Sequence, residues 1–219
     1  MIPDLDFLRI VNPGVFSEVI TRNGYGLTEG CFKDCLVVDA GAHVGNFSYS
    51  AKIIGQAATI VAVEPNPVNF AKLSRVFSRC PEYILWNKAF SHDFSPVLVS
   101  NDDNSSRVGQ QGTPVDAMPL GEIPRLFPSF RSRAALKMDI EGSEYNVLWS
   151  APREVVTFFK SIYLETHGEE VLTLAMIEYL KCFGFRMTRN DRMFSWDVLP
   201  GGGTTNWQPL PAWVLTFHL

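Results

Sequence analysis

Residues 36–46 read LVVDAGAHVGN: a run of apolar residues ends at a carboxylate, and two glycines follow it. An uninterrupted apolar run predicts a strand that is buried on both faces of a parallel sheet. Gly41 and Gly45 predict a tight turn from this strand into a helix, where a missing side chain lets a ligand approach the backbone. A turn of this kind holds a nucleotide-like cofactor at the N-terminus of the helix.

The spacing of these glycines narrows the choice of cofactor. A dinucleotide site needs Gly-x-Gly-x-x-Gly, whose backbone N–H groups wrap a pyrophosphate, so Asp-x-Gly-x-x-x-Gly disfavours a nicotinamide-dependent oxidoreductase. A carboxylate at the strand end repels a pyrophosphate but attracts an ammonium group, such as that of S-adenosylmethionine. The alternative to cofactor binding is an Asp that only caps the helix. The cofactor-binding candidates from this turn are Asp39, Gly41, Ala42, His43, Gly45 and Asn46.

A second apolar run, residues 58–63, ends at Glu64-Pro65-Asn66-Pro67. An acid at the end of the second strand of a βαβ unit accepts hydrogen bonds from ribose hydroxyls. Asn followed by Pro predicts a helix start, with an N-cap side chain and then Pro at the first helical position. A third strand is predicted over residues 83–90, with its end near the adenine. These elements add Glu64, Pro65, Asn66 and Ala89 to the cofactor-binding candidates.

Polar residues also follow two later apolar runs, at residues 134–138 and 161–164. Lys137 and Asp139 face the same side of the first of these strands, because side chains alternate along a strand. Ligands of open α/β sheets bind at the carboxyl ends of the strands. We therefore expect one edge of the sheet to gather Asp39, Glu64, Asp139, Glu165 and His167.

With these segments in order, the sequence resembles the FkbM-type methyltransferases, a branch of the class I S-adenosylmethionine-dependent methyltransferases. The resemblance covers most of residues 36–184, and His43 stands where many relatives have Asn. It implies S-adenosylmethionine as cofactor and a Rossmann-like three-layer α/β sandwich, whose mostly parallel sheet has a reversed C-terminal strand. The matching segments are VVDAGAHVGNFS (37–48), VAVEPNP (61–67), LKMDIEGSEYNVL (136–148) and YLETH (163–167).

The resemblance further implies O-methylation of a hydroxyl on a small molecule, sugar or polyketide-type acceptor. His167 is the candidate general base, because a group that titrates near neutral pH suits removal of a hydroxyl proton. Asp139 would orient the acceptor or the amino group of the cofactor. Lys137 would keep Asp139 ionised or lower the pKa of the acceptor hydroxyl.

Two alternatives stay open. One is a metal-assisted O-methyltransferase in which Asp139, Glu165 and His167 bind a divalent cation, since carboxylates and imidazole are ligands for such ions. The other is a binding module that holds the cofactor without turnover.

Composition agrees with one globular domain over residues 1–219, in which 1–30 form an N-terminal extension suited to a lid. The net charge of −4 gives no electrostatic footprint for nucleic acid, and no apolar run approaches the ~20 residues of a membrane span. The four cysteines have no zinc-binding spacing, and the N-terminus does not resemble a signal peptide, which together favour reduced thiols in the cytoplasm. A long loop containing Gly201–Gly203 is expected between the last two strands.

Overall fold

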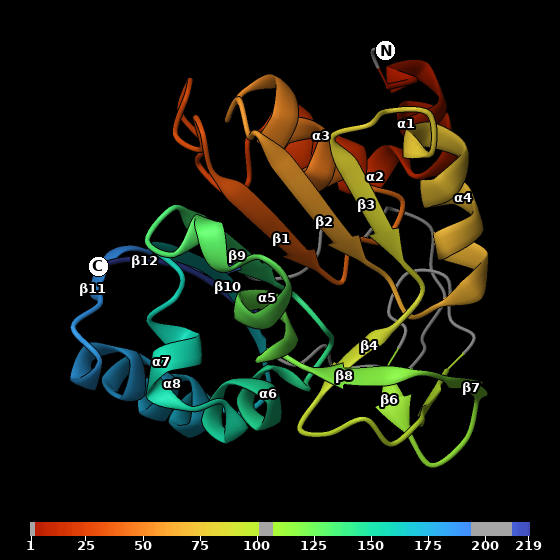
Figure 1. Ribbon diagram of the computed structural model, residues 1–219. Helices are drawn as coiled ribbons and strands as arrows, with labels where there is room; N and C mark the ends of the chain where they lie inside the picture. The colour runs from red at the N-terminus through yellow and green to blue at the C-terminus, as the bar shows by residue number, and fades with distance from the viewer. Residues whose placement is uncertain (1–2, 101–106, 194–211) are drawn as a thin grey trace, which may run out of the picture.

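A computed structural model describes residues 3–100, 107–193 and 212–219 of the chain. At its centre lies a seven-stranded sheet in the order β11-β12-β10-β9-β1-β2-β3 (Figure 1). Strand β12 pairs antiparallel with both of its neighbours, and the pairs among the remaining strands are parallel. The predicted α/β fold, mostly parallel with a reversed C-terminal strand, is confirmed. The strands are β1 (Leu36–Ala40), β2 (Thr59–Val63), β3 (Tyr83–Trp86), β9 (Ala134–Met138), β10 (Ser161–His167), β11 (Arg186–Met193) and β12 (Ala212–His218).

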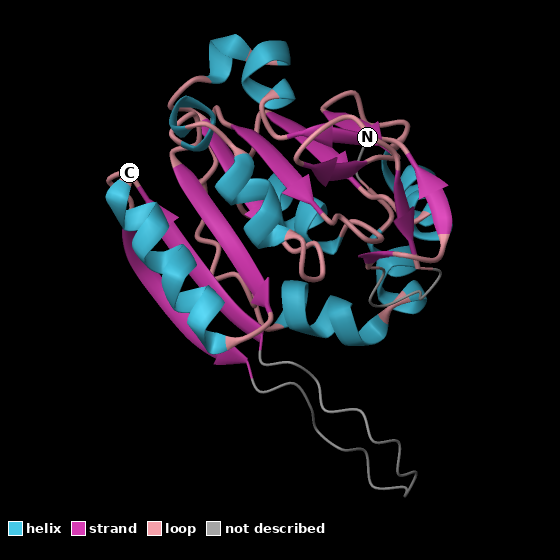
Figure 2. Ribbon diagram, turned by 90° about the horizontal axis from the view of Figure 1, so that it is seen from below, coloured by secondary structure: helices cyan, strands magenta, loops and turns pink. Residues whose placement is uncertain are grey.

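Two groups of helices cover opposite faces of this sheet, as Figures 1 and 2 show. One face carries α1 (Leu5–Val11), α2 (Pro13–Phe16), a π-helical turn η1 (Ser17–Thr21), α3 (Asn46–Ile53) and α4 (Pro67–Phe77). The other carries α5 (Glu122–Leu126), a 3₁₀ turn η2 (Pro128–Phe130), α6 (Glu144–Ser150), α7 (Arg153–Val156) and α8 (Glu170–Cys182).

The two helical layers explain why β1 is apolar throughout. Val37 packs into the core shared with α3 and α4, whereas Leu36 and Val38 pack into the core shared with α6 and α8. Every residue of β1 is buried, so neither face of the strand tolerates a solvated side chain. The first polar residue of the run, Asp39, therefore needs partners inside the protein.

The third strand is shorter than the predicted span of residues 83–90. Strand β3 ends at Trp86, and β4 (Ala89–Ser91) instead pairs with β8 (Ala117–Pro119) in a separate small sheet. Between them the side-chain amide of Asn87 donates to the carbonyls of Glu64 and Pro65, at 2.8 and 3.0 Å. The chain turns away from the main sheet at this residue because its amide is bound to the end of β2. A further three-stranded sheet contains β5 (Val97–Val99), β6 (Val108–Gly109) and β7 (Thr113–Val115).

The predicted helix start at Asn66 is confirmed: its side chain accepts from the N–H groups of Val68 and Asn69, and Pro67 is the first helical residue. The loop expected around Gly201–Gly203 lies outside the described residues. Among the helices of the described segments, none is long and apolar enough to cross a membrane.

Candidate active site

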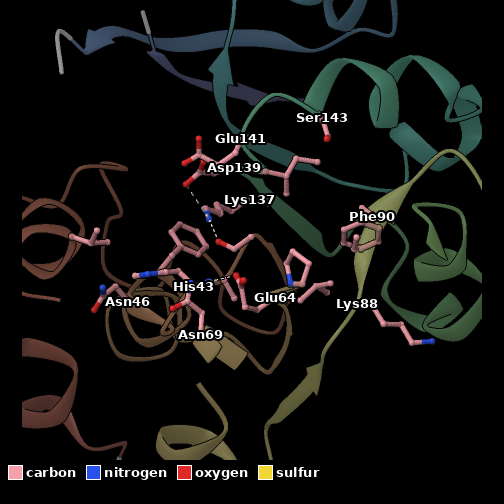
Figure 3. A pocket seen from close by; sticks show the side chains of 18 of the residues that line it. His43, Asn46, Glu64, Asn69, Lys88, Phe90, Lys137, Asp139, Glu141 and Ser143 are labelled. Carbon is pink, nitrogen blue, oxygen red and sulfur yellow. Dashed lines mark hydrogen bonds and ion pairs between the residues drawn. The ribbon is translucent and has the colours of Figure 1, made fainter. Parts of the chain in front are cut away.

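A pocket opens at the carboxyl ends of β1, β2 and β9 (Figure 3). It holds about 920 Å³ of empty space with the open solvent at its mouth included. In Figure 3 Asp139 and Glu141 lie across the pocket from His43, Asn46 and Asn69. The wall is formed by Val15, Val19, Tyr25, Gly41, Ala42, His43, Asn46, Phe47, Val63, Glu64, Pro65, Asn69, Lys88, Ala89, Phe90, Val108, Lys137, Asp139, Ile140, Glu141 and Ser143.

Asp39 lies behind this wall rather than in it. Its carboxylate is fully buried, accepts from the hydroxyl of Ser48 at 2.6 Å, and lies 3.3 Å from Lys137 Nζ. A carboxylate so placed joins β1 to the first turn of α3 and to β9. Its direct contact with the cofactor stays a prediction, and one that this burial disfavours.

The two glycines of the turn are required by the chain's own packing, which corrects one expectation. Both have positive φ, +75° at Gly41 and +98° at Gly45, a region that only glycine enters freely. A Cβ on Gly41 would overlap the carbonyl oxygen of Asp139, and one on Gly45 would overlap the ring of Phe77. The space beside Gly41 is therefore filled by the backbone that follows β9, although Gly41 also lines the pocket.

Lys137 binds the turn to β9 from within. Its ammonium donates to the carbonyls of Gly41 at 2.7 Å and Ala40 at 3.4 Å, and it lies 3.5 Å from a carboxylate oxygen of Asp139. Burial alone would lower the pKa of Lys137, but the charges of Asp39 and Asp139 outweigh it and raise that pKa. Lys137 is thus a fixed cation in the wall of the pocket.

Glu64 holds the glycine turn against the end of β2. One carboxylate oxygen accepts from the N–H of His43 at 2.7 Å and the other from the N–H of Asn66 at 2.8 Å. His43 adopts φ +53°, a left-handed conformation that Asn and His enter more readily than most residues. Burial raises the pKa of Glu64 to about 7. Each carboxylate oxygen has two lone pairs, so both still have capacity to accept from a ligand hydroxyl.

Asn46 lines the pocket with a side-chain amide that makes no hydrogen bond within the described residues. It is the first residue of α3, it is 2% exposed, and neither its amide nitrogen nor its amide oxygen has a hydrogen-bond partner within the described residues. Burying an amide without partners costs ~1–3 kcal/mol per group. A polar ligand that both donates and accepts would remove this cost.

His167 lies behind the pocket, amid four carboxylates. Its Nδ1 is 3.2 Å from Glu144, and its Nε2 lies 3.6 Å from Glu165 and 3.9 Å from both Asp139 and Glu141. Burial would lower the pKa of this imidazole, but the hydrogen bond to Glu144 and the charges around it raise the pKa to about 10. An imidazole in that state is a proton donor at neutral pH, which runs against the predicted general-base role.

Glu144 organises the loop after β9 as well as His167. Its carboxylate is fully buried and accepts from the N–H groups of Ile140 and Gly142, at 2.8 and 2.9 Å. Glu144 belongs to the LKMDIEGSEYNVL segment, but its contact with His167, 23 residues away, exists only in the fold.

A possible cation site differs from the predicted one. Ligand atoms of Asp139, Glu144 and His167 lie within 4.8 Å of one another, and this is the group of metal-ligating side chains found in the described part of the chain. Glu165 lies outside that group. Its carboxylate instead accepts from the hydroxyl of Tyr25 at 3.2 Å, and burial together with Asp139 raises its pKa to about 8.

The predicted site residues thus divide into two sets. Those lining the pocket are Gly41, Ala42, His43, Asn46, Glu64, Pro65, Ala89, Lys137 and Asp139; those behind its wall are Asp39, Gly45, Asn66, Glu165 and His167. Sequence reasoning missed Asn69, Phe90, Glu141 and Ser143 as pocket residues. Glu141 and Ser143 could have been predicted, because they belong to the LKMDIEGSEYNVL segment. No pattern in the sequence marks Asn69.

Comparison with known proteins agrees with this geometry. Residues 39–187 match the methyltransferase FkbM domain, and the chain belongs to that family. Its membership confirms the prediction of S-adenosylmethionine as the cofactor of a methyltransferase. No functionally curated protein was found to match the sequence.

Three solved structures show the same fold at low identity. Methyltransferase FkbM from Methylobacillus flagellatus KT has a TM-score of 0.59 at 15% identity, over 93% of this chain and 48% of the other. A candidate RNA methyltransferase from Pyrococcus horikoshii, PH1948, has 0.52 at 14%, over 93% and 82%. TYW2 from P. horikoshii, in complex with MeSAdo, has 0.51 at 13%, over 90% and 60%. Since an RNA methyltransferase shares this fold, the fold alone does not give the acceptor.

Proposed function

We propose that this chain transfers the methyl group of S-adenosylmethionine to a hydroxyl oxygen of a small-molecule or sugar acceptor. The observation that carries the proposal is Asn46, a buried amide without partners within the described residues that lines the pocket beside the glycine turn. The α-ammonium and carboxylate of the cofactor are a donor and an acceptor, which such an amide can bind together. Glu64, across the same turn, would accept from the ribose hydroxyls.

The rest of the wall fits the adenosine and the acceptor. Pro65, Asn69 and Ala89 surround the side next to Glu64, where the adenine would lie. Phe90 and Val108 add apolar surface to the pocket that Asp139 and Glu141 also line. With the adenosine beside Glu64, the acceptor would enter on the side of Asp139 and Glu141.

The protein needs to supply few chemical groups for this reaction. The hydroxyl oxygen forms a bond to the methyl carbon, the bond from that carbon to sulfur breaks, and its electron pair stays on the sulfur of S-adenosylhomocysteine. The hydroxyl proton leaves to a base or to water. Since the sulfonium methyl is already activated, holding oxygen, carbon and sulfur in line supplies much of the rate.

Asp139, which was predicted only to orient the acceptor or the cofactor, is a second candidate for the proton acceptor besides His167. Its side chain is 26% exposed in the pocket and lies beside Lys137 and His167, both of which are cations there. His167 as the base predicts turnover that rises with pH up to about 10. A pH profile of turnover without that rise would exclude His167 as the base.

A metal-assisted reaction is the second candidate, because Asp139, Glu144 and His167 bring ligand atoms within 4.8 Å. Two observations weaken it: both oxygens of Glu144 already accept backbone N–H groups, and His167 holds a proton where a metal would bind. Turnover that is lost with a chelator and restored by Mg²⁺ or Mn²⁺ would favour this candidate.

The test is a transfer assay with isotopically labelled S-adenosylmethionine and a panel of hydroxyl-bearing acceptors, read by the mass of the product. We expect label in one acceptor class together with stoichiometric S-adenosylhomocysteine. Cofactor binding without release of S-adenosylhomocysteine, whatever the acceptor, would instead mark a non-catalytic binding module.

A further inference from the structure

Negative charge is in excess around Asp139, on the acceptor side of the pocket. The carboxyl groups of Asp139, Glu141, Glu144 and Glu165 all lie within 3.9 Å of one imidazole, that of His167. They come from the loop after β9, the start of α6 and the end of β10. One imidazolium cannot neutralise Asp139, Glu141 and Glu144 together.

The cations near Asp139 each interact with other groups as well. Lys137 also neutralises Asp39 and donates to two carbonyls of the turn. His167 is divided among four carboxylates and bonds most closely to Glu144. Arg107 reaches Glu141 at 3.4 Å, but its side chain is 38% exposed and solvent screens the pair.

Asp139 and Glu141 are nevertheless open to a ligand. Their side chains are 26% and 22% exposed, and both line the pocket. In Figure 3 the side chain of Lys88 points away from them, so this basic residue of the wall does not offset their charge. The unpartnered amide of Asn46, across the pocket from them, indicates that a bound molecule completes this pocket, and a cofactor bound to that amide leaves the acidic side open to the acceptor.

We propose that the acceptor carries a protonated amine beside the hydroxyl that is methylated, and that Asp139 and Glu141 bind this ammonium group. The proposal rests on the proposed function. The cofactor supplies only one net positive charge, from an ammonium and a sulfonium against a carboxylate, which leaves the acidic side able to take another cation. The same charge repels acceptors that carry phosphate or carboxylate groups.

The experiment uses three matched probes: trans-2-aminocyclohexanol, trans-1,2-cyclohexanediol and trans-2-hydroxycyclohexanecarboxylate. Their binding to the full chain is measured by ligand-observed NMR with sinefungin bound, an analogue that carries an amine in place of the sulfonium and transfers no methyl group. We expect the amine to bind about tenfold more tightly than the diol, since a hydrogen bond to a charged group exceeds a neutral one by roughly that factor. The carboxylate should bind least, and added salt should weaken the amine alone.

The matched variants are Glu141→Gln and Glu178→Gln, the latter in an exposed ion pair with Lys181 on α8. The first should lose most of the preference for the amine, and the second should keep it. Equal binding of amine and diol, tighter binding of the carboxylate, no probe binding at all, or a preference unchanged by Glu141→Gln would each overturn the proposal. An amine preference seen only without sinefungin would overturn it too, because the amine would then be occupying the place of the sulfonium. Failure of sinefungin itself to bind would count against the proposed function instead.

Discussion

The two sides of the pocket are held by different kinds of interaction. On the side of β1 and β2, the interactions mostly involve the backbone. The turn carries two positive-φ glycines, and Glu64 accepts hydrogen bonds from the N–H groups of His43 and Asn66. On the side of β9 and β10, side chains hold one another, with His167 among four carboxylates and Lys137 between two. The first side should therefore be intolerant of added volume, and the second should respond most to the loss or titration of a charged side chain.

The largest effect is expected from adding volume on the backbone side. Gly41→Val combines positive φ with overlap of its Cβ and the Asp139 carbonyl, so strain and overpacking together should cost up to about 6 kcal/mol of unfolding free energy. Denaturant unfolding measures the cost. Gly109→Val is the control, because nothing lies within 4 Å of a Cβ there. A Gly41→Val protein as stable as the control would contradict the packing that we assign to the turn.

The next effect is expected where the two sides meet. Lys137→Met leaves Asp39 buried without its cation, and breaking a buried pair typically costs about 3–5 kcal/mol. Lys181→Met removes an exposed pair with Glu178 and should cost about 0–1 kcal/mol. Melting curves of both variants give the comparison. Similar losses in the two would show that Lys137 does not stabilise the turn.

A smaller effect, on binding rather than folding, is expected at Glu64. Glu64→Ala should weaken binding of the cofactor by about 1.5–3 kcal/mol, the usual loss for hydrogen bonds to a charged group. Isothermal titration calorimetry on folded protein gives this value. Unchanged affinity would remove Glu64 from the cofactor site.

The last effect concerns pH, and it belongs mainly to the acidic side. His167 and Glu165 have pKa values of about 10 and 8 in the folded protein, both above their ordinary values of 6.5 and 4.5. A raised pKa contributes stability below the ordinary value and loses it as pH rises to the folded value. We therefore expect the unfolding free energy to fall between pH 4.5 and 10, with Glu165 contributing up to about 8 and His167 from 6.5 to about 10, so that the part above 8 comes from His167. His167→Gln should flatten that upper part, and an unaltered slope would place the titration elsewhere.

The sequence predicted the β1 and β2 side of the pocket better than the β9 and β10 side. Apolar runs, glycines and Asn66 with Pro67 are local signals, and they predicted β1, β2, α4 and the turn between them. The role of Asp39 was predicted less well, because its partner Lys137 is 98 residues away and the pairing exists only once β9 lies beside β1.

The acidic side could not be assembled from local patterns. The predicted convergence of Asp139, Glu165 and His167 brought the right residues to one edge of the sheet. It could not foresee that Glu144 would bind His167 and the loop, or that Tyr25 would reach Glu165 from 140 residues away. The protonation state of His167 follows from those contacts. The general-base role was predicted from the ordinary pKa of histidine, which does not take them into account.

The most direct test of the cofactor site is calorimetric titration of S-adenosylmethionine into the wild-type chain and two asparagine variants. Asn46→Ala removes the buried amide without partners, and Asn146→Ala removes an exposed one on α6. We expect a dissociation constant near 1 μM, about −8 kcal/mol, for the wild type and for Asn146→Ala. Asn46→Ala should bind about tenfold more weakly, the loss of a hydrogen bond to a charged group. Equal affinity in all three, or no binding to the wild type, would contradict the site proposed here.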